Sequence, residues 1–229
     1  MQMPADSSYR YERKFHTSSL FREDVVNIIK LHPANFGLAY PDRFVNNIYL
    51  DTAEFDCFND NVDGAASRCK YRIRWYGSTL GPVTAPVLEV KAKENLVGTK
   101  ASFPLPTFNL DQEFTADSLR SIFSKAQLPA LTRLTLREYY PVLLNGYRRK
   151  YFVSFDKKFR LTVDDKMHYR AIKGSGNFYL GKAIDAESVI VELKYGLDDT
   201  EEYNTIANYL NVRMTKSSKY VSGVFDIYG

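Results

Sequence analysis

Charged and apolar residues alternate with a period of two in several short segments of the chain. In segment 70–76, Lys70, Arg72 and Arg74 take every second position, and an aromatic or aliphatic residue fills each position between them. Successive side chains of a strand point to opposite faces of a sheet, so the pattern predicts strands with one apolar and one charged face. The same alternation occurs in segments 10–15, where Arg13 is an exception on the apolar face, and in 88–93, 160–164 and 191–195.

These patterns predict about eight strands and few helices. The strand candidates are residues 9–16, 44–51, 67–76, 86–93, 131–144, 148–156, 159–164 and 188–195. Helices are predicted at 18–33, 116–126, 198–210 and 217–225, and a short helix or turn at 54–61. The early part of 131–144 can continue a helix. Asn145-Gly146 predicts a hairpin between two strands, and 100–109 is predicted to be irregular or edge-like. With no linker or repeat in 1–229, the chain is expected to form a single antiparallel α+β domain, either a sandwich or a closed barrel.

The composition supports one globular domain in a reducing compartment. The chain has 229 residues, of which 45% are hydrophobic, 14% aromatic and 25% charged, and this aromatic content excludes a disordered chain. No apolar run approaches the roughly 20 residues that span a bilayer, and the first residues lack a secretory pattern. Two cysteines without metal or disulfide spacing agree with a cytoplasmic location. Nucleotide-binding glycine motifs and zinc-helix histidine spacing are also absent.

The placement of the charges is more informative than the net charge of +4. A single charged face is most simply a solvated outer face, but the set as a whole places many cations on adjacent strands. Like charges on adjacent strands repel by about 0.2–1 kcal/mol each, so such a set calls for an anionic partner. Arginine is suited to bidentate phosphate binding, and carboxylates among the cations are candidate Mg²⁺ or Mn²⁺ ligands. The residues on these faces are Arg10, Glu12, Lys14, Lys70, Arg72, Arg74, Glu89, Lys91, Lys93, Arg149, Arg160, Thr162, Asp164, Glu192 and Lys194.

Eight of these segments occur in an order that resembles a known family. They are RYERKF (10–15), NIYLDT (47–52), KYRIRWY (70–76), LEVKAK (88–93), YRRKYF (147–152), RLTVDD (160–165), VIVELKY (189–195) and KSSKY (216–220). Together they resemble the VTC domain, the polyphosphate polymerase module of the vacuolar transporter chaperone complex, over residues 9–225. That domain belongs to the triphosphate tunnel metalloenzyme, or CYTH-like, superfamily. The resemblance implies a closed eight-stranded antiparallel β-barrel with peripheral helices, whose tunnel is lined by Arg, Lys and Glu.

The resemblance also implies roles for individual residues. It implies a catalytic set of Arg72, Arg74, Lys91, Arg149, Arg160 and Glu192. It implies further substrate-binding cations at Lys100, Lys216 and Lys219, and the charged strand faces add Arg10, Lys14, Lys70, Lys93 and Lys194. It implies Mn²⁺ or Mg²⁺ as cofactor, with Glu192, Glu12 and Glu89 as candidate ligands. One departure from hydrolytic relatives is Arg10, which gives R-x-E-x-K in place of their E-x-E-x-K and favours the polymerase branch.

Three functions therefore stand as hypotheses. The first is a polymerase that transfers the γ-phosphate of ATP to inorganic polyphosphate; the second is a triphosphatase of the same fold. The third is a non-catalytic binder of polyphosphate or nucleic acid, which the retained carboxylates disfavour. An RNA binder would interleave aromatic residues with the cations, whereas here the aromatics are expected on the opposite faces, so no specific nucleic acid is expected. The chain shows no membrane segment of its own, and the resemblance leaves a membrane-protein partner open.

Overall fold

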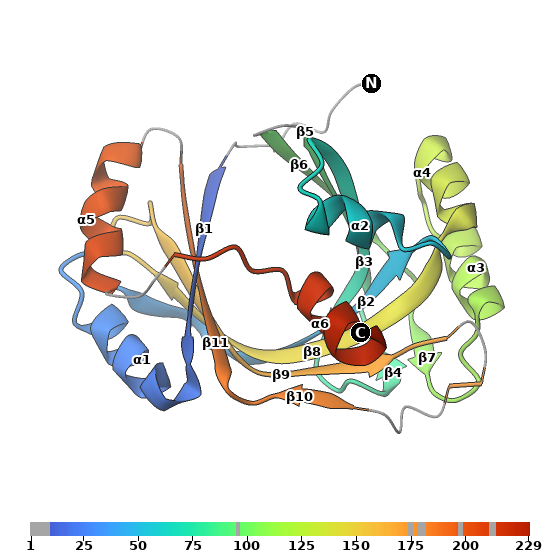
Figure 1. The fold of residues 1–229 in the computed structure, drawn as a ribbon, viewed down its shortest axis with the longest axis horizontal. Helices are drawn as coiled ribbons and strands as arrows, with labels where there is room; N and C mark the ends of the chain where they lie inside the picture. The colour runs from blue at the N-terminus through green and yellow to red at the C-terminus, as the bar shows by residue number, and fades with distance from the viewer. Residues whose placement is uncertain (1–9, 95–96, 174–175, 178–181, 197–198, 211–213) are drawn as a thin grey trace. The chain divides into compact units, whose positions relative to one another are not determined.

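The computed structural model describes residues 10–94, 97–173, 176–177, 182–196, 199–210 and 214–229. Within these ranges the chain has a mixed α+β fold (Figure 1). The strands are β1 (Arg10–Ser18), β2 (Gly37–Asp51), β3 (Ser67–Tyr76), β4 (Gly81–Val83), β5 (Val87–Glu94), β6 (Val97–Pro104), β7 (Phe108–Leu110), β8 (Tyr140–Val153), β9 (Arg160–Ala171), β10 (Ala183–Asp185) and β11 (Ser188–Gly196). The helices are α1 (Arg22–Lys30), α2 (Asp56–Val62), α3 (Ala116–Lys125), α4 (Ala130–Thr135), α5 (Thr200–Leu210) and α6 (Lys219–Tyr228), with short 3-10 helices η1 (Ser19–Phe21) and η2 (Leu136–Glu138).

Nine of the described strands hydrogen-bond into one sheet. The strand order is β1-β11-β9-β8-β2-β3-β5-β6, with β10 paired to β9 beside this path, and β4 and β7 form a separate pair. The registers of β1/β11, β11/β9, β2/β3, β3/β5 and β5/β6 are antiparallel. In the described part of the chain no pairing of the end strands β1 and β6 closes this path. The antiparallel α+β fold is therefore confirmed, whereas the closed eight-stranded barrel is not.

The chain divides into two compact units that interleave along the sequence. The first unit comprises the described residues of 1–43, 147–167 and 185–217, and the second comprises those of 44–146, 168–184 and 218–229. Strands β2, β8 and β9 each contribute residues to both units. The assignment of 1–229 to a single domain stays a prediction, and each unit is described by itself below.

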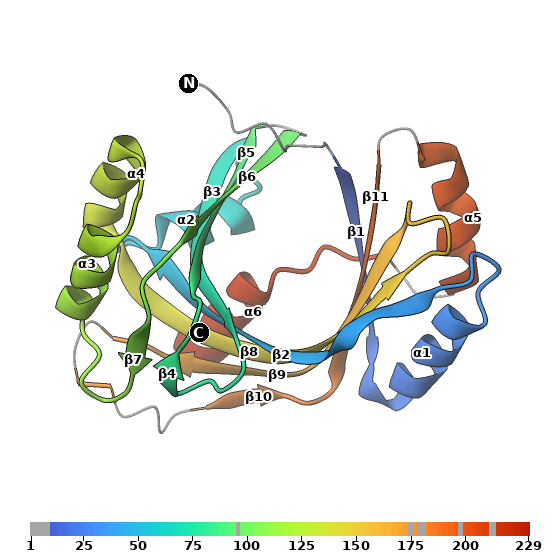
Figure 2. The same cartoon turned by 180° about the vertical axis from the view of Figure 1, so that it is seen from behind.

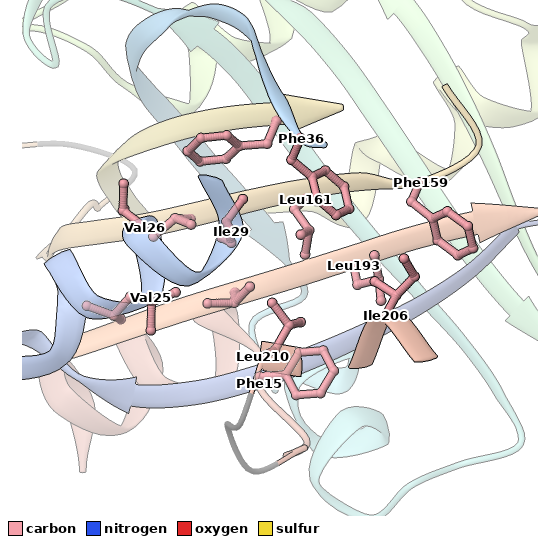
Figure 3. Packing of buried hydrophobic residues seen from close by; sticks show 14 of the residues in the cluster. Phe15, Val25, Val26, Ile29, Phe36, Phe159, Leu161, Leu193, Ile206 and Leu210 are labelled. Carbon is pink, nitrogen blue, oxygen red and sulfur yellow. The ribbon is translucent and has the colours of Figure 1, made fainter. Parts of the chain in front are cut away.

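In the first unit, helices α1 and α5 contact each other and form a core with the apolar faces of β9 and β11 (Figure 3). Val191 and Leu193 of β11 are fully buried, and Val25 and Ile29 of α1 pack into the same cluster. Burying an aliphatic side chain of this size contributes about 1.5–3 kcal/mol, so the apolar face orients the strand. The residue between them, Glu192, consequently points to the other face of the sheet.

In the second unit, the predicted alternation of β3 is confirmed. Tyr71, Ile73 and Trp75 are buried, whereas the basic residues between them are partly accessible. Helices α2 and α6 contact each other, and both are labelled in the two opposite views of Figures 1 and 2. Asp51 ends β2, accepts hydrogen bonds from two backbone N–H groups at the start of α2, and also accepts one from the Tyr220 hydroxyl of α6. This single carboxylate therefore joins a strand to two helices.

The predicted hairpin at Asn145-Gly146 is wrong, because both residues lie inside the continuous strand β8. Gly146 does not have the positive φ of a tight-turn glycine. A Cβ added there would lie 2.3 Å from Cε1 of His168, so glycine is needed for close packing rather than for a turn. The Asn145 side chain is fully buried in a hydrogen-bonded chain described below. A dipeptide typical of turns can therefore serve the interior of a strand.

Other predictions differ from the structure in smaller ways. The early part of segment 131–144 is helical, as α4 and η2, before β8 begins. The segment expected to be irregular or edge-like contains β6, which is an end strand of the sheet path, and β7. Among the described residues, no helix is long and apolar enough to cross a membrane.

Candidate functional site: two charged clusters

In the second unit, a buried carboxylate lies among three cationic side chains. Glu89 of β5 is 5% exposed, and it pairs with Arg72 and Arg74 of β3 and with Lys100 of β6. Arg72 donates to Glu89 Oε2 through Nε at 2.7 Å and Nη2 at 2.5 Å. Lys100 Nζ lies 2.6 Å from Glu89 Oε1, and Arg74 Nη1 lies 3.7 Å from the same oxygen. These four residues, the Glu89 cluster, carry three cations against one carboxylate.

A row of lysines crosses the strands next to the Glu89 cluster. Lys70 of β3 stands opposite Lys91 of β5, which in turn stands opposite Lys100 of β6. Like charges directly opposite one another destabilise a sheet, by about 0.2–1 kcal/mol for each pair. Lys70 Nζ also donates to Ser218 Oγ, which caps the first turn of α6, at 3.0 Å. The row therefore places three lysines side by side on adjacent strands.

Two asparagines orient one arginine of the Glu89 cluster. Arg74 Nε donates to Asn47 Oδ1 at 3.1 Å, and Asn47 Nδ2 donates to Asn145 Oδ1 at 3.2 Å. Asn145 in turn donates to the backbone oxygen of His168. Both asparagines are fully buried, so this chain holds the Arg74 guanidinium in one orientation. Neither Asn47 nor Asn145 was among the predicted site residues, because a neutral amide contributes nothing to a charge pattern.

In the first unit, opposite charges face each other across β1 and β11. Glu12 stands opposite Lys194, and Lys14 stands opposite Glu192. Lys194 Nζ lies 2.6 Å from Glu192 Oε1 and 3.6 Å from Glu12 Oε2. Two carboxylates therefore converge on one ammonium group. These four residues are named the Glu192 cluster.

A buried ion pair joins the neighbouring strands of the first unit. Arg149 of β8 forms two hydrogen bonds with Asp164 of β9, from Nε to Oδ1 at 2.5 Å and from Nη2 to Oδ2 at 2.7 Å. Asp164 is 0% exposed and Arg149 is 8% exposed. Burial by itself lowers the pKa of Arg149, but the charge of Asp164 outweighs it and raises that pKa well above its ordinary value. Arg149 is therefore a permanent, rigidly oriented cation.

Both buried glutamates are held in the ionised form. Burial by itself raises the pKa of Glu89, but Arg72, Arg74 and a hydrogen bond from Lys100 outweigh it and lower that pKa. The same balance applies to Glu192, whose pKa is held well below its ordinary value by Lys194, Arg149 and Lys14. These carboxylates are consequently weak bases at neutral pH.

The donor set of the Glu192 cluster fits a divalent ion better than that of the Glu89 cluster. No group of three or more His, Cys, Asp or Glu side chains suited to a metal occurs in the described ranges. Mg²⁺ commonly uses only one or two carboxylates together with substrate phosphates, and Glu12 and Glu192 supply two around one cationic position. Thr162, opposite Glu192 on β9, has a buried Oγ1 without a hydrogen-bond partner among the described residues. The oxygens of Glu89 are instead engaged by three cations.

The remaining predicted residues of the first unit are less closely tied to the Glu192 cluster. Lys14 Nζ, besides its place in the cluster, donates to the backbone oxygen of Ser217 at 3.0 Å. Arg160 is exposed at the start of β9, although its register position is opposite Lys194. Lys216 is exposed. Arg10 begins β1, but its side chain lies outside the described residues.

In the second unit, Lys93 and Lys219 lie near the edges of the basic face. Lys93 is half-buried and stands opposite Arg68, which precedes Lys70 by two residues on the same face of β3. Arg68 was not among the predicted residues, although the period-two pattern of β3 could have identified it. Lys219 is the first residue of α6 and follows Ser218, the partner of Lys70. The basic face therefore extends over four consecutive alternate positions of β3.

The protein is thus an antiparallel α+β protein with two charged clusters, each of which contains a buried glutamate. The VTC domain family model matches residues 9–228, so the chain belongs to the VTC domain family. This finding confirms the resemblance to the VTC domain. None of the curated proteins matches the chain.

The fold of the chain is similar to that of several solved structures. A candidate adenylate cyclase from Vibrio parahaemolyticus has a TM-score of 0.52 at 12% identity, with 93% of this chain and 96% of that chain covered. A candidate adenylyl cyclase from Hippeastrum, described as having a dominant triphosphatase activity, has a TM-score of 0.51 at 15% identity, with 95% and 94% covered. A protein from Pyrococcus horikoshii has a TM-score of 0.50 at 14% identity, with 92% and 96% covered. At these identities the likeness shows the fold, and the family together with the fold supports a phosphate-related enzyme.

Proposed function

We propose that the protein is a polyphosphate polymerase that transfers the γ-phosphate of ATP to the end of an inorganic polyphosphate chain. The observation that carries the proposal is the excess of cations around the buried Glu89, together with the opposed row of Lys70, Lys91 and Lys100 beside it. A linear polyphosphate carries closely spaced negative charges that such a row can neutralise. Membership of the VTC domain family supports the same substrate class.

Phosphoryl transfer depends mainly on positioning and charge neutralisation rather than on a protein nucleophile. The residues assigned to phosphate binding are Arg72, Arg74, Lys91, Arg149 and Arg160. In the transfer, the bond from the γ-phosphorus to the β–γ bridging oxygen breaks, a terminal polyphosphate oxygen forms the new bond to the γ-phosphorus, and ADP leaves.

A divalent ion, Mn²⁺ or Mg²⁺, would be held by Glu192 with Glu12, and it would supply charge neutralisation at the phosphate oxygens. Lys194 occupies the position between these carboxylates and moves aside in this proposal. Glu89 is assigned a different role: it is the counter-ion that keeps the guanidinium groups of Arg72 and Arg74 oriented for phosphate binding. Its three ion pairs support this role over direct metal binding.

The alternative within the same fold is a triphosphatase, in which water attacks instead of phosphate. Activation of water requires a general base, and the buried carboxylates Glu192 and Asp164 are each paired with a cation. A terminal phosphate is already ionised and needs no base. Arg10 also stands where hydrolytic relatives have a glutamate. These two features favour transfer to phosphate over hydrolysis.

Incubation with ATP and Mn²⁺, followed by gel electrophoresis of the products, tests the proposal. Long polyphosphate chains accompanied by ADP are expected, whereas release of orthophosphate alone would establish the triphosphatase. The Glu192→Gln variant should lose turnover but keep most of its calorimetric affinity for tripolyphosphate, because the cations that bind phosphate are unchanged. Full activity of that variant would show that Glu192 holds no metal.

A further inference from the structure

Tyrosines alternate with a functional arginine on β8. Tyr147, Arg149 and Tyr151 occupy every second position of the strand and therefore share a face. The guanidinium carbon of Arg149 lies 5.2 Å from the centre of the Tyr147 ring and 5.9 Å from that of the Tyr151 ring. The expectation that aromatic residues lie only on faces opposite to the cations is therefore wrong for this strand.

The neighbouring part of β2, in the same unit, extends this row. The guanidinium carbon of Arg43 lies 4.6 Å from the centre of the Tyr40 ring and 5.8 Å from that of the Tyr151 ring. The rings of Tyr40 and Tyr151 meet edge to face, with 5.6 Å between their centres. Tyr40, Arg43 and Tyr151, named the aromatic ladder, therefore adjoin Arg149.

Exposure increases along this series of residues. Tyr147 is 1% exposed and Arg149 is 8% exposed, whereas Tyr151 is half-buried and Tyr40 is 51% exposed. The ladder thus leads from the buried ion pair of Arg149 to a surface that solvent can reach. Tyr40, at the exposed end of the ladder, can therefore be reached by a ligand from solvent.

The contacts of β2 with β8 keep this surface ordered. Lys150 Nζ, on the opposite face of β8 from Arg149, lies 3.0 Å from Asp42 Oδ2. This ion pair joins the strand segment that carries Tyr40 to the strand that carries Tyr151. A surface whose rings are already positioned loses little conformational entropy when a flat ligand stacks on it.

The chemistry of these groups matches the two ends of a nucleotide. Nucleobases stack on aromatic rings and on guanidinium planes, and arginine donates hydrogen bonds to phosphate. Because Asp164 accepts from Nε and Nη2 of Arg149, the Nη1 group is the one that would meet a phosphate. Tyr151 is two residues from Arg149, which is about 7 Å along a strand. A ribose connects phosphate and base over a comparable span.

We propose that the aromatic ladder binds the base of the nucleoside triphosphate donor while Arg149 binds its phosphates. This inference rests on the proposed function, since it assigns the donor's base to a site next to the phosphate-binding cations. Stacking recognises the flat face that all bases share, so the site accepts GTP nearly as well as ATP. Inorganic tripolyphosphate has no base and makes no use of the ladder.

Calorimetric titration of the intact chain with ATP and with tripolyphosphate, without divalent metal so that neither ligand turns over, tests the inference. The Tyr40→Ala and Tyr151→Leu variants are expected to weaken ATP binding about 5- to 100-fold and to leave tripolyphosphate affinity within about twofold. Tyr151→Phe, which keeps the ring, should retain ATP affinity. Tyr209→Ala is the matched control, because Tyr209 is also 51% exposed and lies on α5 in the same unit.

Three results would overturn the inference. ATP affinity that is unchanged in Tyr40→Ala and Tyr151→Leu, while tripolyphosphate still binds, would refute the base site and leave the proposed function intact. Equal weakening of both ligands would show that the ladder acts only by supporting Arg149. Failure of the unsubstituted protein to bind either ligand would refute the proposed function as well.

Discussion

Replacement of Glu89 by glutamine removes one negative charge from the Glu89 cluster while preserving the size of the side chain. In the variant, Arg72, Arg74 and Lys100 remain close together but lack the carboxylate that all three contact in the unsubstituted protein. Removing one partner of a buried ion pair costs about 3–5 kcal/mol, because the remaining charge stays buried without compensation. The variant is therefore expected to fold less stably, whatever its effect on catalysis.

The accessibility of the three cations sets the size of the effect. The side chains of Arg72 and Arg74 are 15% and 16% exposed, whereas Lys100 is 48% exposed. A pair as accessible as Lys100–Glu89 contributes at most about 1 kcal/mol, so Arg72, with its two short hydrogen bonds, dominates. A total of about 3 kcal/mol is expected, at the lower end of the range for buried pairs. For a chain of this length that corresponds to a fall in Tm of about 6–12 °C.

Thermal unfolding of the two proteins, with and without tripolyphosphate, measures the effect. Tripolyphosphate should raise the Tm of Glu89→Gln more than that of the unsubstituted protein, because the bound ligand supplies the missing negative charge. Glu113→Gln is the matched control in the same unit, since Glu113 is exposed and a substitution there should change stability by no more than about 0.5 kcal/mol.

A Glu89→Gln protein that melts within 2 °C of the unsubstituted one, on the order of the shift expected from less than 1 kcal/mol, would refute the counter-ion role. An unchanged Tm together with loss of stabilisation by Mn²⁺ would instead identify Glu89 as a metal ligand. The counter-ion role therefore predicts a lower Tm for Glu89→Gln, whereas a metal-ligand role predicts an unchanged Tm and a weaker response to Mn²⁺.

Three further predictions use the same unfolding assays. Gly146→Ala should cost about 1–3 kcal/mol in urea unfolding, because the added methyl group overlaps the His168 ring; an unchanged midpoint would contradict the packing. Folding lowers the pKa values of Glu89 and Glu192, so both ionised carboxylates stabilise the fold fully above their unfolded pKa of about 4.3. This stabilisation is lost as the pH falls below that value, so Tm should drop between about pH 5 and pH 3. The drop should be less steep in Glu89→Gln. Thr162→Val should reduce the rise in Tm that Mn²⁺ produces, whereas Thr162→Ser should preserve that rise. An equal rise in both variants would show that Thr162 does not contact the metal.

The apolar and charged faces of single strands could be predicted from the sequence, because the alternation within a strand is a property of neighbouring residues. The bounds predicted for β3, residues 67–76, agree with the structure, and its buried and accessible faces were assigned correctly. The same pattern identified both buried glutamates and most of the cations around them. Asn145-Gly146 shows the limit of local signals, because its conformation is decided by contact with His168, far along the chain.

Pairing between distant strands was decided only by the tertiary structure. Period-two patterns state which face a residue takes, but the register between strands determines which residue stands opposite, and many registers satisfy the same pattern. Glu89 reaches three cations on two different strands, and Asn47 meets Asn145 at a separation of 98 residues. Arg43 and Tyr151 likewise adjoin only because β2 pairs with β8. The sequence determined which chemical groups lie on the charged faces, and the fold determined which of them act together, because hydrogen bonds and ion pairs require distances that only the packed chain establishes.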